Sequence, residues 1–212
     1  SSSATTSGGV VSIAADGSFT YTPLSGYSGT DTFTYKVKDS TGLVSNEAAT
    51  VTITVSTPVW FINNSVSGGG NSGMFASPFE SMADFNTAQT NAGATDPEAG
   101  DIIFVYEGSS DYDSGITLLD NQQLIGEGAG LTISPNLSIA AGDDPTLDKA
   151  SGTVVTLASG NTLSGLTVST ASATAIAGTG IVGATLTNVD ITVAPGGSTA
   201  FKLSNASGTV TY

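Results

Sequence analysis

The sequence predicts an all-β protein built from many short strands, and two observations carry that prediction. Only 10% of the residues are charged and 27 are glycine. Serine, threonine and valine are abundant, which favours strands and turns over helices. Apolar and polar residues alternate in the first part of the chain, whereas strand-like segments recur at a regular interval in the second part. Alternation indicates sheets with one wet face, and recurrence with a period between about 20 and 50 residues is typical of a solenoid.

The charge balance excludes several classes of partner. The chain has 18 acidic residues against four lysines, no histidine and a formal net charge of −14 at pH 7. Such a surface repels the phosphates of nucleic acids and anionic lipid head groups, so we expect no nucleic-acid partner. No run of about 18 apolar residues occurs, so we expect no membrane span in this part of the protein. The chain has no cysteine and therefore no disulfide.

The first part of the chain has the pattern of antiparallel strands. Residues 9–23 predict a hairpin that turns at Asp16 and Gly17, because Asp-Gly favours tight turns. Residues 30–38 and 49–55 each alternate with period two. The apolar residues that share one face are Phe33, Tyr35 and Val37 in the first of these strands and Val51, Ile53 and Val55 in the second.

Motifs in this part carry a family resemblance. The runs Asp16–Pro23 and Gly26–Tyr35, with the closing strand Ala49–Val55, resemble tandem bacterial immunoglobulin-like or cadherin-like repeats. Such repeats form the stalks of large bacterial adhesins. The resemblance implies a partial immunoglobulin-like β-sandwich over residues 1–57, matching the C-terminal half of such a domain.

The clearest helix start follows the first apolar strand of the second part. Ser77 can serve as the N-cap, Pro78 suits the first turn and Glu80 completes a capping box. The pattern predicts a short helix over about 78–90. Short strands are expected at 59–62, 101–106, 115–119, 123–126, 131–133 and 208–212, with a loop at about 134–151.

Later strands repeat in register. Leu163–Val168 aligns with Leu186–Ile191, and Val210 follows Leu186 after a similar interval. A second series recurs in parallel with the first and consists of Val155, Ile176 and Phe201. Coils that stack on one another explain these spacings, whereas a sandwich does not require them.

A second resemblance covers this region. The segments Trp60–Ile62, Ser77–Met82 and Ala99–Tyr106 resemble the N-terminal cap of pectate-lyase-like right-handed β-helix proteins. The resemblance implies a single-stranded right-handed parallel β-helix over 58–212, opened by a short N-terminal capping helix. Thr57-Pro58 is the expected junction, because proline interrupts strand pairing. We expect further coils or another subunit beyond the last strand.

Two acidic pairs are the candidate metal ligands. Asp111 and Asp113 follow a predicted strand, and Asp143 and Asp144 lie in the long loop. Carboxylates next to loop carbonyls favour Ca²⁺. The same pairs could hydrolyse a glycosidic bond if they were held about 5–10 Å apart. They could also be plain solvated loop residues.

No catalytic residue is assigned. Polysaccharide lyases of the resembled family use a basic residue, and Lys149 and Lys202 are the only bases in this region. Tyr112 could stack on a sugar. Asn188 and Asn205 are expected to form an internal amide ladder in the turns of the solenoid.

Together these patterns favour an extracellular or cell-surface bacterial protein, adhesin-like and structural or binding in role, and part of a larger chain. A carbohydrate or a host or cell-surface molecule is the expected partner. The alternative is a polysaccharide-active β-helix enzyme, a lyase or glycoside hydrolase, whose site lies in further coils. A self-assembling, phage-tail-like β-helix is a third possibility. The oligomeric state stays open.

Overall fold

The structure, a computed structural model, divides the chain into two compact units. One runs through Pro58 and the other begins at Val59. Each unit is described by itself. The residues that the structure describes are 2–23, 29–55, 57–68, 71–91, 96–133, 137–195 and 198–212.

The first unit contains two antiparallel sheets. Three strands pair in the order β1-β2-β3, and β4 pairs with β5 along its whole length. The expected hairpin at Asp16 is confirmed, since β2 pairs with β3 and the Asp16 carboxylate accepts a 3.0 Å hydrogen bond from the Ser18 amide. The strands are β1 (Ser2–Ala4), β2 (Val10–Ile13), β3 (Phe19–Thr22), β4 (Gly29–Tyr35) and β5 (Ala49–Val55).

A small apolar core lies between these two sheets. Val11 and Phe33 are buried, and the ring of Phe33 meets that of Phe19 edge-on at 5.2 Å. The expected face is only partly buried, because β4 ends at Tyr35 and Val37 is 61% exposed. Residues Gly26 to Ser28 of the repeat motif lie outside the described part of the chain.

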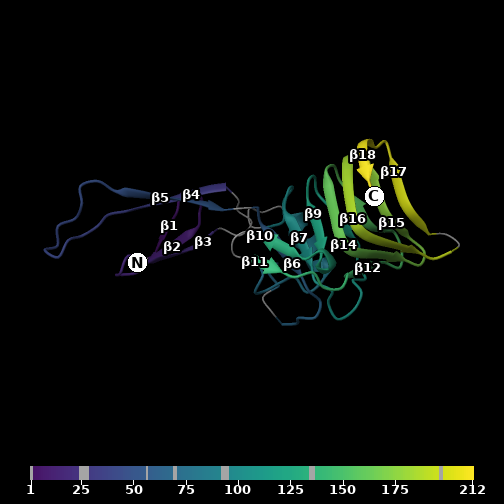
Figure 1. Ribbon diagram of the computed structural model, residues 1–212, viewed down its shortest axis with the longest axis horizontal. Coiled ribbons are helices and arrows are strands. Elements are labelled where there is room, and N and C mark those ends of the chain that lie inside the picture. The colour runs from purple at the N-terminus through teal and green to yellow at the C-terminus, as the bar shows by residue number, and fades with distance from the viewer. Residues whose placement is uncertain are drawn as a thin grey trace. The chain divides into compact units, whose positions relative to one another are not determined.

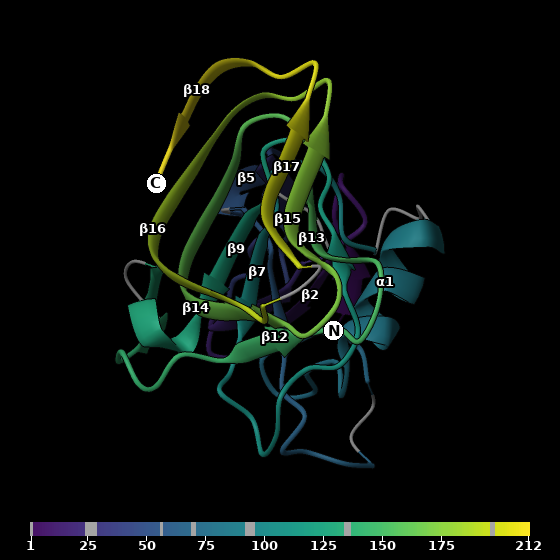
Figure 2. The ribbon, with the colours of Figure 1, turned by 90° about the vertical axis from the view of Figure 1, so that its right-hand side faces the viewer.

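The second unit is a β-solenoid of about five turns in which successive coils pair in parallel. Its first face follows the order β6-β7-β9-β14-β16-β18 (Figure 1). Another face follows the order β8-β13-β15-β17. Between them β12 pairs with the second half of β14, which bends around the corner (Figure 2). The strands are β6 (Val59–Ile62), β7 (Ile102–Val105), β8 (Ile116–Thr117), β9 (Gln123–Gly126), β12 (Thr146–Asp148), β13 (Thr153–Leu157), β14 (Asn161–Thr170), β15 (Thr174–Thr179), β16 (Val182–Val193), β17 (Thr199–Ser204) and β18 (Ser207–Thr211).

Apolar side chains from paired positions stack inside the solenoid. The expected pairing of Leu163 with Leu186 is confirmed, and so are the matches in the second series. The position expected for Val210 is wrong. It pairs with Ala184, because the register shifts between Val182 and Ala184. The three stacks are Trp60, Ile103, Leu124, Leu163 and Leu186; Tyr112, Leu147, Val168 and Ile191; and Ile116, Val155, Ile176 and Phe201.

Helix α1 (Met82–Asn91) begins later than the sequence predicts. The backbone of Phe79 is used by the sheet instead, since its amide donates to Phe61 and its carbonyl accepts from Asn63, each at 2.8 Å. Ser81 is therefore the N-cap, and its hydroxyl accepts from the Asp84 amide at 3.1 Å. Among the described residues, no helix is long and apolar enough to cross a membrane.

The helix covers the edge of the face that begins with β8. Asn86 donates from its side-chain amide to the Gly115 carbonyl, and Gln89 donates to the Thr117 carbonyl, both at 2.7 Å. These carbonyls belong to the outermost strand of that face, or adjoin it, and would otherwise face no strand. The expected capping role of the helix therefore has a specific basis in side-chain amides.

A polar stack runs through the corner before the first face. Asp101, Gln122 and Asn161 occupy successive coils and are all buried. The Trp60 indole donates to Asp101 at 2.7 Å, and burial raises the pKa of that carboxyl. The Asn161 amide donates to the Leu119 carbonyl at 2.7 Å. This stack supplies hydrogen-bond partners inside an otherwise apolar column.

The amide ladder expected at Asn188 and Asn205 is wrong. Both side chains are exposed, and both residues have left-handed backbones with φ of 52° and 51°. Asparagine tolerates this conformation better than most residues. These two positions therefore serve to turn the chain, and the buried polar stack lies at the corner described above.

The long loop contains two strands that the sequence did not reveal. One of them, β12, completes the second stack, and the other forms an antiparallel hairpin over the outer side of the first face. This hairpin covers Phe61 and Phe104 and closes a second apolar core with Leu131. Residues 134–136 of the expected loop lie outside the described part. The hairpin strands are β10 (Leu131–Ile133) and β11 (Leu137–Ile139), which follow the 3₁₀ turn η1 (Glu127–Ala129).

Candidate functional site

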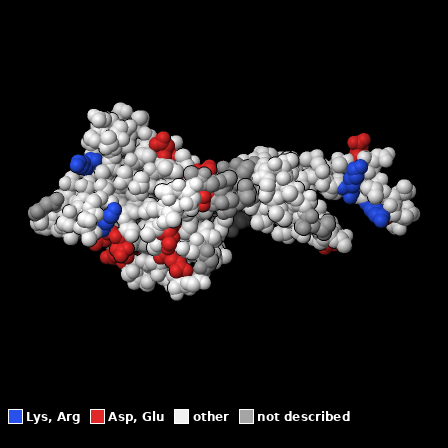
Figure 3. Space-filling model, turned by 180° about the vertical axis from the view of Figure 1, so that it is seen from behind, with Lys and Arg blue, Asp and Glu red and all other residues white. Residues whose placement is uncertain are grey.

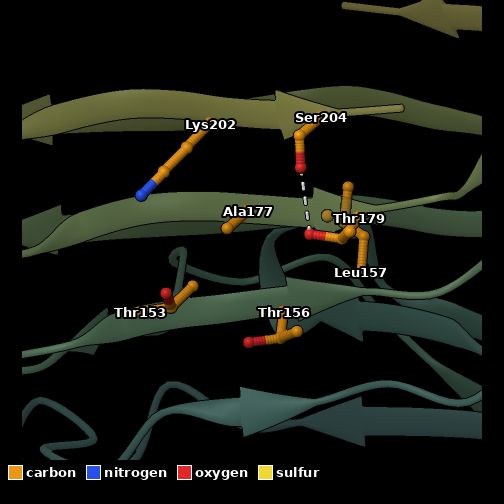
Figure 4. A pocket seen from close by; sticks show the side chains of 8 residues that line it. Thr153, Thr156, Leu157, Ala177, Thr179, Lys202 and Ser204 are labelled. Atoms are coloured by element: carbon orange, nitrogen blue, oxygen red, sulfur yellow. Dashed lines mark hydrogen bonds between the residues drawn. The ribbon is translucent and has the colours of Figure 1, made fainter. Parts of the chain in front are cut away.

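The outer surface of β13, β15 and β17 is hollowed into a groove of about 370 Å³. Its middle is low because β15 carries Ala177 between Thr156 and Lys202 of the neighbouring coils. Figure 4 shows these side chains side by side on three parallel strands. The remaining lining residues are Thr153, Leu157, Gly178, Thr179 and Ser204.

Hydroxyl groups dominate the groove. Those of Thr179 and Ser204 lie 3.1 Å apart and hydrogen-bond to each other between adjacent coils. Thr153 and Thr156 supply two more from β13. The described part of the lining contains no aromatic ring, so a ligand here would be held by hydrogen bonds and charge.

Lys202 is the one charged residue among the described residues that line the groove. It is exposed, and its side chain extends from β17 toward β15 (Figure 4). Within the described chain it has no ion-pair or hydrogen-bond partner. The solenoid carries 14 of the protein's 18 acidic residues and two of its four lysines. On the face of this unit that Figure 3 shows, the red Asp and Glu side chains cover more of the surface than the blue Lys side chains.

Asp111 and Asp113 are exposed on either side of a buried tyrosine. Tyr112 is 3% exposed and its hydroxyl donates to the Tyr106 carbonyl at 2.9 Å. Burial raises its pKa to about 12. The expected stacking of Tyr112 on a sugar is therefore wrong, because the ring forms the base of an internal stack.

Asp143 and Asp144 lie at a different place. Asp143 is exposed, whereas Asp144 is half-buried against Gly128. Partial burial raises the pKa of Asp144, and the carboxylates of Asp190 and Asp143 raise it further. Within the described residues, no three potential metal-ligating side chains form a group that could hold one ion.

Calcium binding at these aspartates stays a prediction with a direct test. If Asp143 and Asp144 hold structural Ca²⁺, millimolar Ca²⁺ raises the melting temperature and a chelator reverses the rise. The Asp143→Asn and Asp144→Asn double variant loses that response, whereas the Asp111→Asn and Asp113→Asn variant keeps it. An identical melting temperature with Ca²⁺ and with chelator would contradict both proposed sites.

Asp31, a carboxylate that the sequence analysis did not single out, is fully buried in the first unit. It accepts hydrogen bonds from the hydroxyls of Thr6 and Tyr21 at 3.0 and 2.9 Å, and also from that of Thr5. The Ser7 amide donates to it at 2.8 Å. Although burial opposes ionisation, these donors lower its pKa well below the usual value. The sequence contained a signal for its burial, because Asp31 lies two residues before Phe33 and therefore on the same face of the strand.

In comparisons with known proteins, one family matches the first unit. The family model of the bacterial cadherin-like domain matches residues 1–57. No curated protein and no solved structure matches the chain. The chain thus joins a bacterial cadherin-like domain, at residues 1–57, to a β-solenoid.

Proposed function

We propose that this protein is an extracellular, adhesin-like binding protein of bacteria in which the solenoid presents a carbohydrate-binding groove. The cadherin-like domain supports the adhesin-like role, because such domains are typical of surface proteins. The groove on β13, β15 and β17 supports a sugar ligand. Four hydroxyls on a rigid parallel sheet offer donors and acceptors that suit sugar hydroxyls.

The observation that carries the proposal is the groove's construction. Thr156, Ala177 and Lys202 occupy one register position in three successive coils. Their neighbours Thr179 and Ser204 are already joined by a hydrogen bond. Polar groups are therefore held at fixed spacing on strands, which lowers the entropy lost when a ligand binds.

The groove-filling variant Ala177→Trp tests this proposal. We expect the labelled wild-type chain to bind cells that carry surface polysaccharide, and expect periodate oxidation of those glycans to abolish binding. Ala177→Trp should weaken binding at least about tenfold, because the indole occupies the space of the ligand. Thr187→Trp, on the outer side of β16, is the matched control and should bind as the wild type does.

Binding that survives both periodate and Ala177→Trp would contradict a carbohydrate groove. A depolymerisation assay addresses the alternative function. Cleavage of pectin, alginate or a related glycan by the chain would favour the polysaccharide-active enzyme over the adhesin-like protein.

A further inference from the structure

We propose that the groove selects a glycan that carries one carboxylate on an otherwise neutral chain, and that Lys202 is the residue that recognises this carboxylate. The inference rests on the proposed carbohydrate function of the groove and names its ligand class. It follows from three observations: an ammonium without an ion-pair partner among the described residues, a hydroxyl lining and a strongly acidic chain.

The ammonium group of Lys202 has no ion-pair partner among the described residues. Lys202 extends from β17 toward β15, to one side of Ala177 (Figure 4). It has no carboxylate partner within the described part of the chain, although the solenoid carries 14 acidic residues. A lysine in so acidic a surface would pair readily if a carboxylate lay within reach. The groove therefore holds a cation free to bind a ligand anion.

The hydroxyl groups that line the groove indicate the chemistry of the uncharged part of the ligand. Hydroxyls of Thr153, Thr156, Thr179 and Ser204 surround the low middle at Ala177. Neutral hydroxyls form hydrogen bonds with sugar hydroxyls without adding charge. A ligand that matches the whole groove is consequently polar, largely uncharged and anionic at one point.

The net charge of the chain disfavours a polyanion. The chain has a net charge of −14, and the two lysines of the solenoid are far outnumbered by its carboxylates. Each additional carboxylate on a ligand is repelled by this field, and Lys202 can neutralise only one. A single acidic sugar gains the attraction of Lys202 without most of that repulsion, whereas a polyuronate does not.

The experiment compares matched oligosaccharides by titration calorimetry at low salt. The probes are a neutral oligosaccharide with one terminal glucuronic acid, the methyl ester of that compound, the same acid placed within the chain, and oligogalacturonate. We expect the free acid to bind about tenfold more tightly than its ester, as one charge-assisted hydrogen bond provides. Comparison of the terminal acid with the internal acid shows whether the groove takes the carboxylate at the end of a glycan chain or within it.

Two lysine variants complete the test. Lys202→Gln should reduce the acid-to-ester ratio to about one. Lys149→Gln removes the same charge from the solenoid outside the groove lining and should leave the ratio unchanged. Equal loss in both variants, equal binding of acid and ester, or tighter binding of oligogalacturonate would each overturn the inference.

The two proposals fail in different ways. If acid and ester bind equally to the wild type and Ala177→Trp abolishes both, the carbohydrate groove stands and the role of Lys202 is wrong. If none of the oligosaccharides binds, the proposed function and the inference are both wrong.

Discussion

Replacement of Asp31 by asparagine is expected to unfold the cadherin-like domain at neutral pH while the solenoid stays folded. Asp31 is the main polar point at which the two sheets of the domain are joined, beside the contact of Phe19 with Phe33. Its carboxylate accepts from Tyr21 on β3 and from Thr6 and Ser7 in the turn after β1, and the residue itself belongs to β4. The domain has little apolar core besides Val11 and Phe33. The polar junction must therefore carry much of its stability.

Asparagine has the same shape but the wrong chemistry at this site. A carboxylate offers acceptors at both oxygens, and the surrounding groups are donors: three hydroxyls and the amides of Ser7 and Thr32. The amide nitrogen of asparagine could donate only if the hydroxyls of Thr5 and Tyr21 turned from donating to accepting, and their own protons would then lose the carboxylate. Buried donors without acceptors are costly, and the charge-assisted hydrogen bonds would be lost as well.

Hydrogen exchange separates the two units. In Asp31→Asn, amides of β2 to β5 should exchange rapidly, while Trp60 fluorescence, which reports on the solenoid alone, should be unchanged. Asp16→Asn is the matched control, because Asp16 is an exposed aspartate of the same domain that bonds only to its own turn. Unaltered protection of β2 to β5 in Asp31→Asn would show that the junction is not needed.

The same carboxylate predicts the pH dependence of the domain. Its folded pKa lies below the ordinary value of 3.8, so the folded state binds fewer protons there than the unfolded state. The stabilisation is therefore fully present above about pH 4 to 5 and is lost as pH falls toward the folded pKa. Acid titration followed by hydrogen exchange should show the cadherin-like domain opening in acid, and Asp31→Asn should not show this transition.

The sequence predicted the solenoid well because its signal is repeated. Leu163 and Leu186, and likewise Val155, Ile176 and Phe201, pair as their spacing required. A regular stack of apolar residues reinforces the same period in each coil. The match failed for Val210, where a register shift breaks the period and no neighbouring repeat signals it.

Single residues were harder to predict because their roles depend on distant partners. Ser77 has a capping pattern as good as that of Ser81, but pairing of Phe79 with Ile62 takes that segment into the sheet. Tyr112 follows a strand and looks like a loop residue until Leu147 stacks on it. Tertiary contacts override local preference in both cases.

The groove could not be found from sequence for the same reason. Thr156, Ala177 and Lys202 lie a full coil apart in the sequence, and only the stacking of coils brings them together. The second series of spacings gave the alignment of Val155, Ile176 and Phe201, and the residue after each is the one that faces outward. The sequence could therefore have indicated the site through the residues that follow this apolar series by one position.

Gly165→Ala is expected to destabilise the solenoid more than a change of backbone conformation alone can explain. Gly165 lies at the bend within β14, between the half that pairs with β9 and the half that pairs with β12, with φ of 62°. A Cβ there would overlap the backbone nitrogen of Ala129 and lie 2.7 Å from its Cα. Alanine therefore has two costs: about 1–2 kcal/mol for the left-handed conformation, and about 1–3 kcal/mol for overpacking against a backbone that must move.

Gly180→Ala separates these two costs. Gly180 has a φ of 68°, and a Cβ added to it meets nothing within 4 Å. It should show only the conformational cost, so the difference between the two variants measures the overlap with Ala129. Urea unfolding monitored by Trp60 fluorescence gives both values, provided that the two variants share one m-value. Equal destabilisation would mean that η1 yields without cost.

The next coil offers an independent comparison at the same corner. Asn188 occupies the position beside Gly165 in the register of β14 and β16, with φ of 52° and an exposed side chain. Because asparagine tolerates this backbone, Asn188→Gly should change the unfolding free energy by only a few tenths of a kcal/mol. Gly165→Asn should nevertheless be as damaging as Gly165→Ala, since its Cβ meets the same atoms of Ala129. If Gly165→Asn were tolerated, backbone conformation alone would explain the glycine, and η1 would not be a fixed part of the solenoid wall.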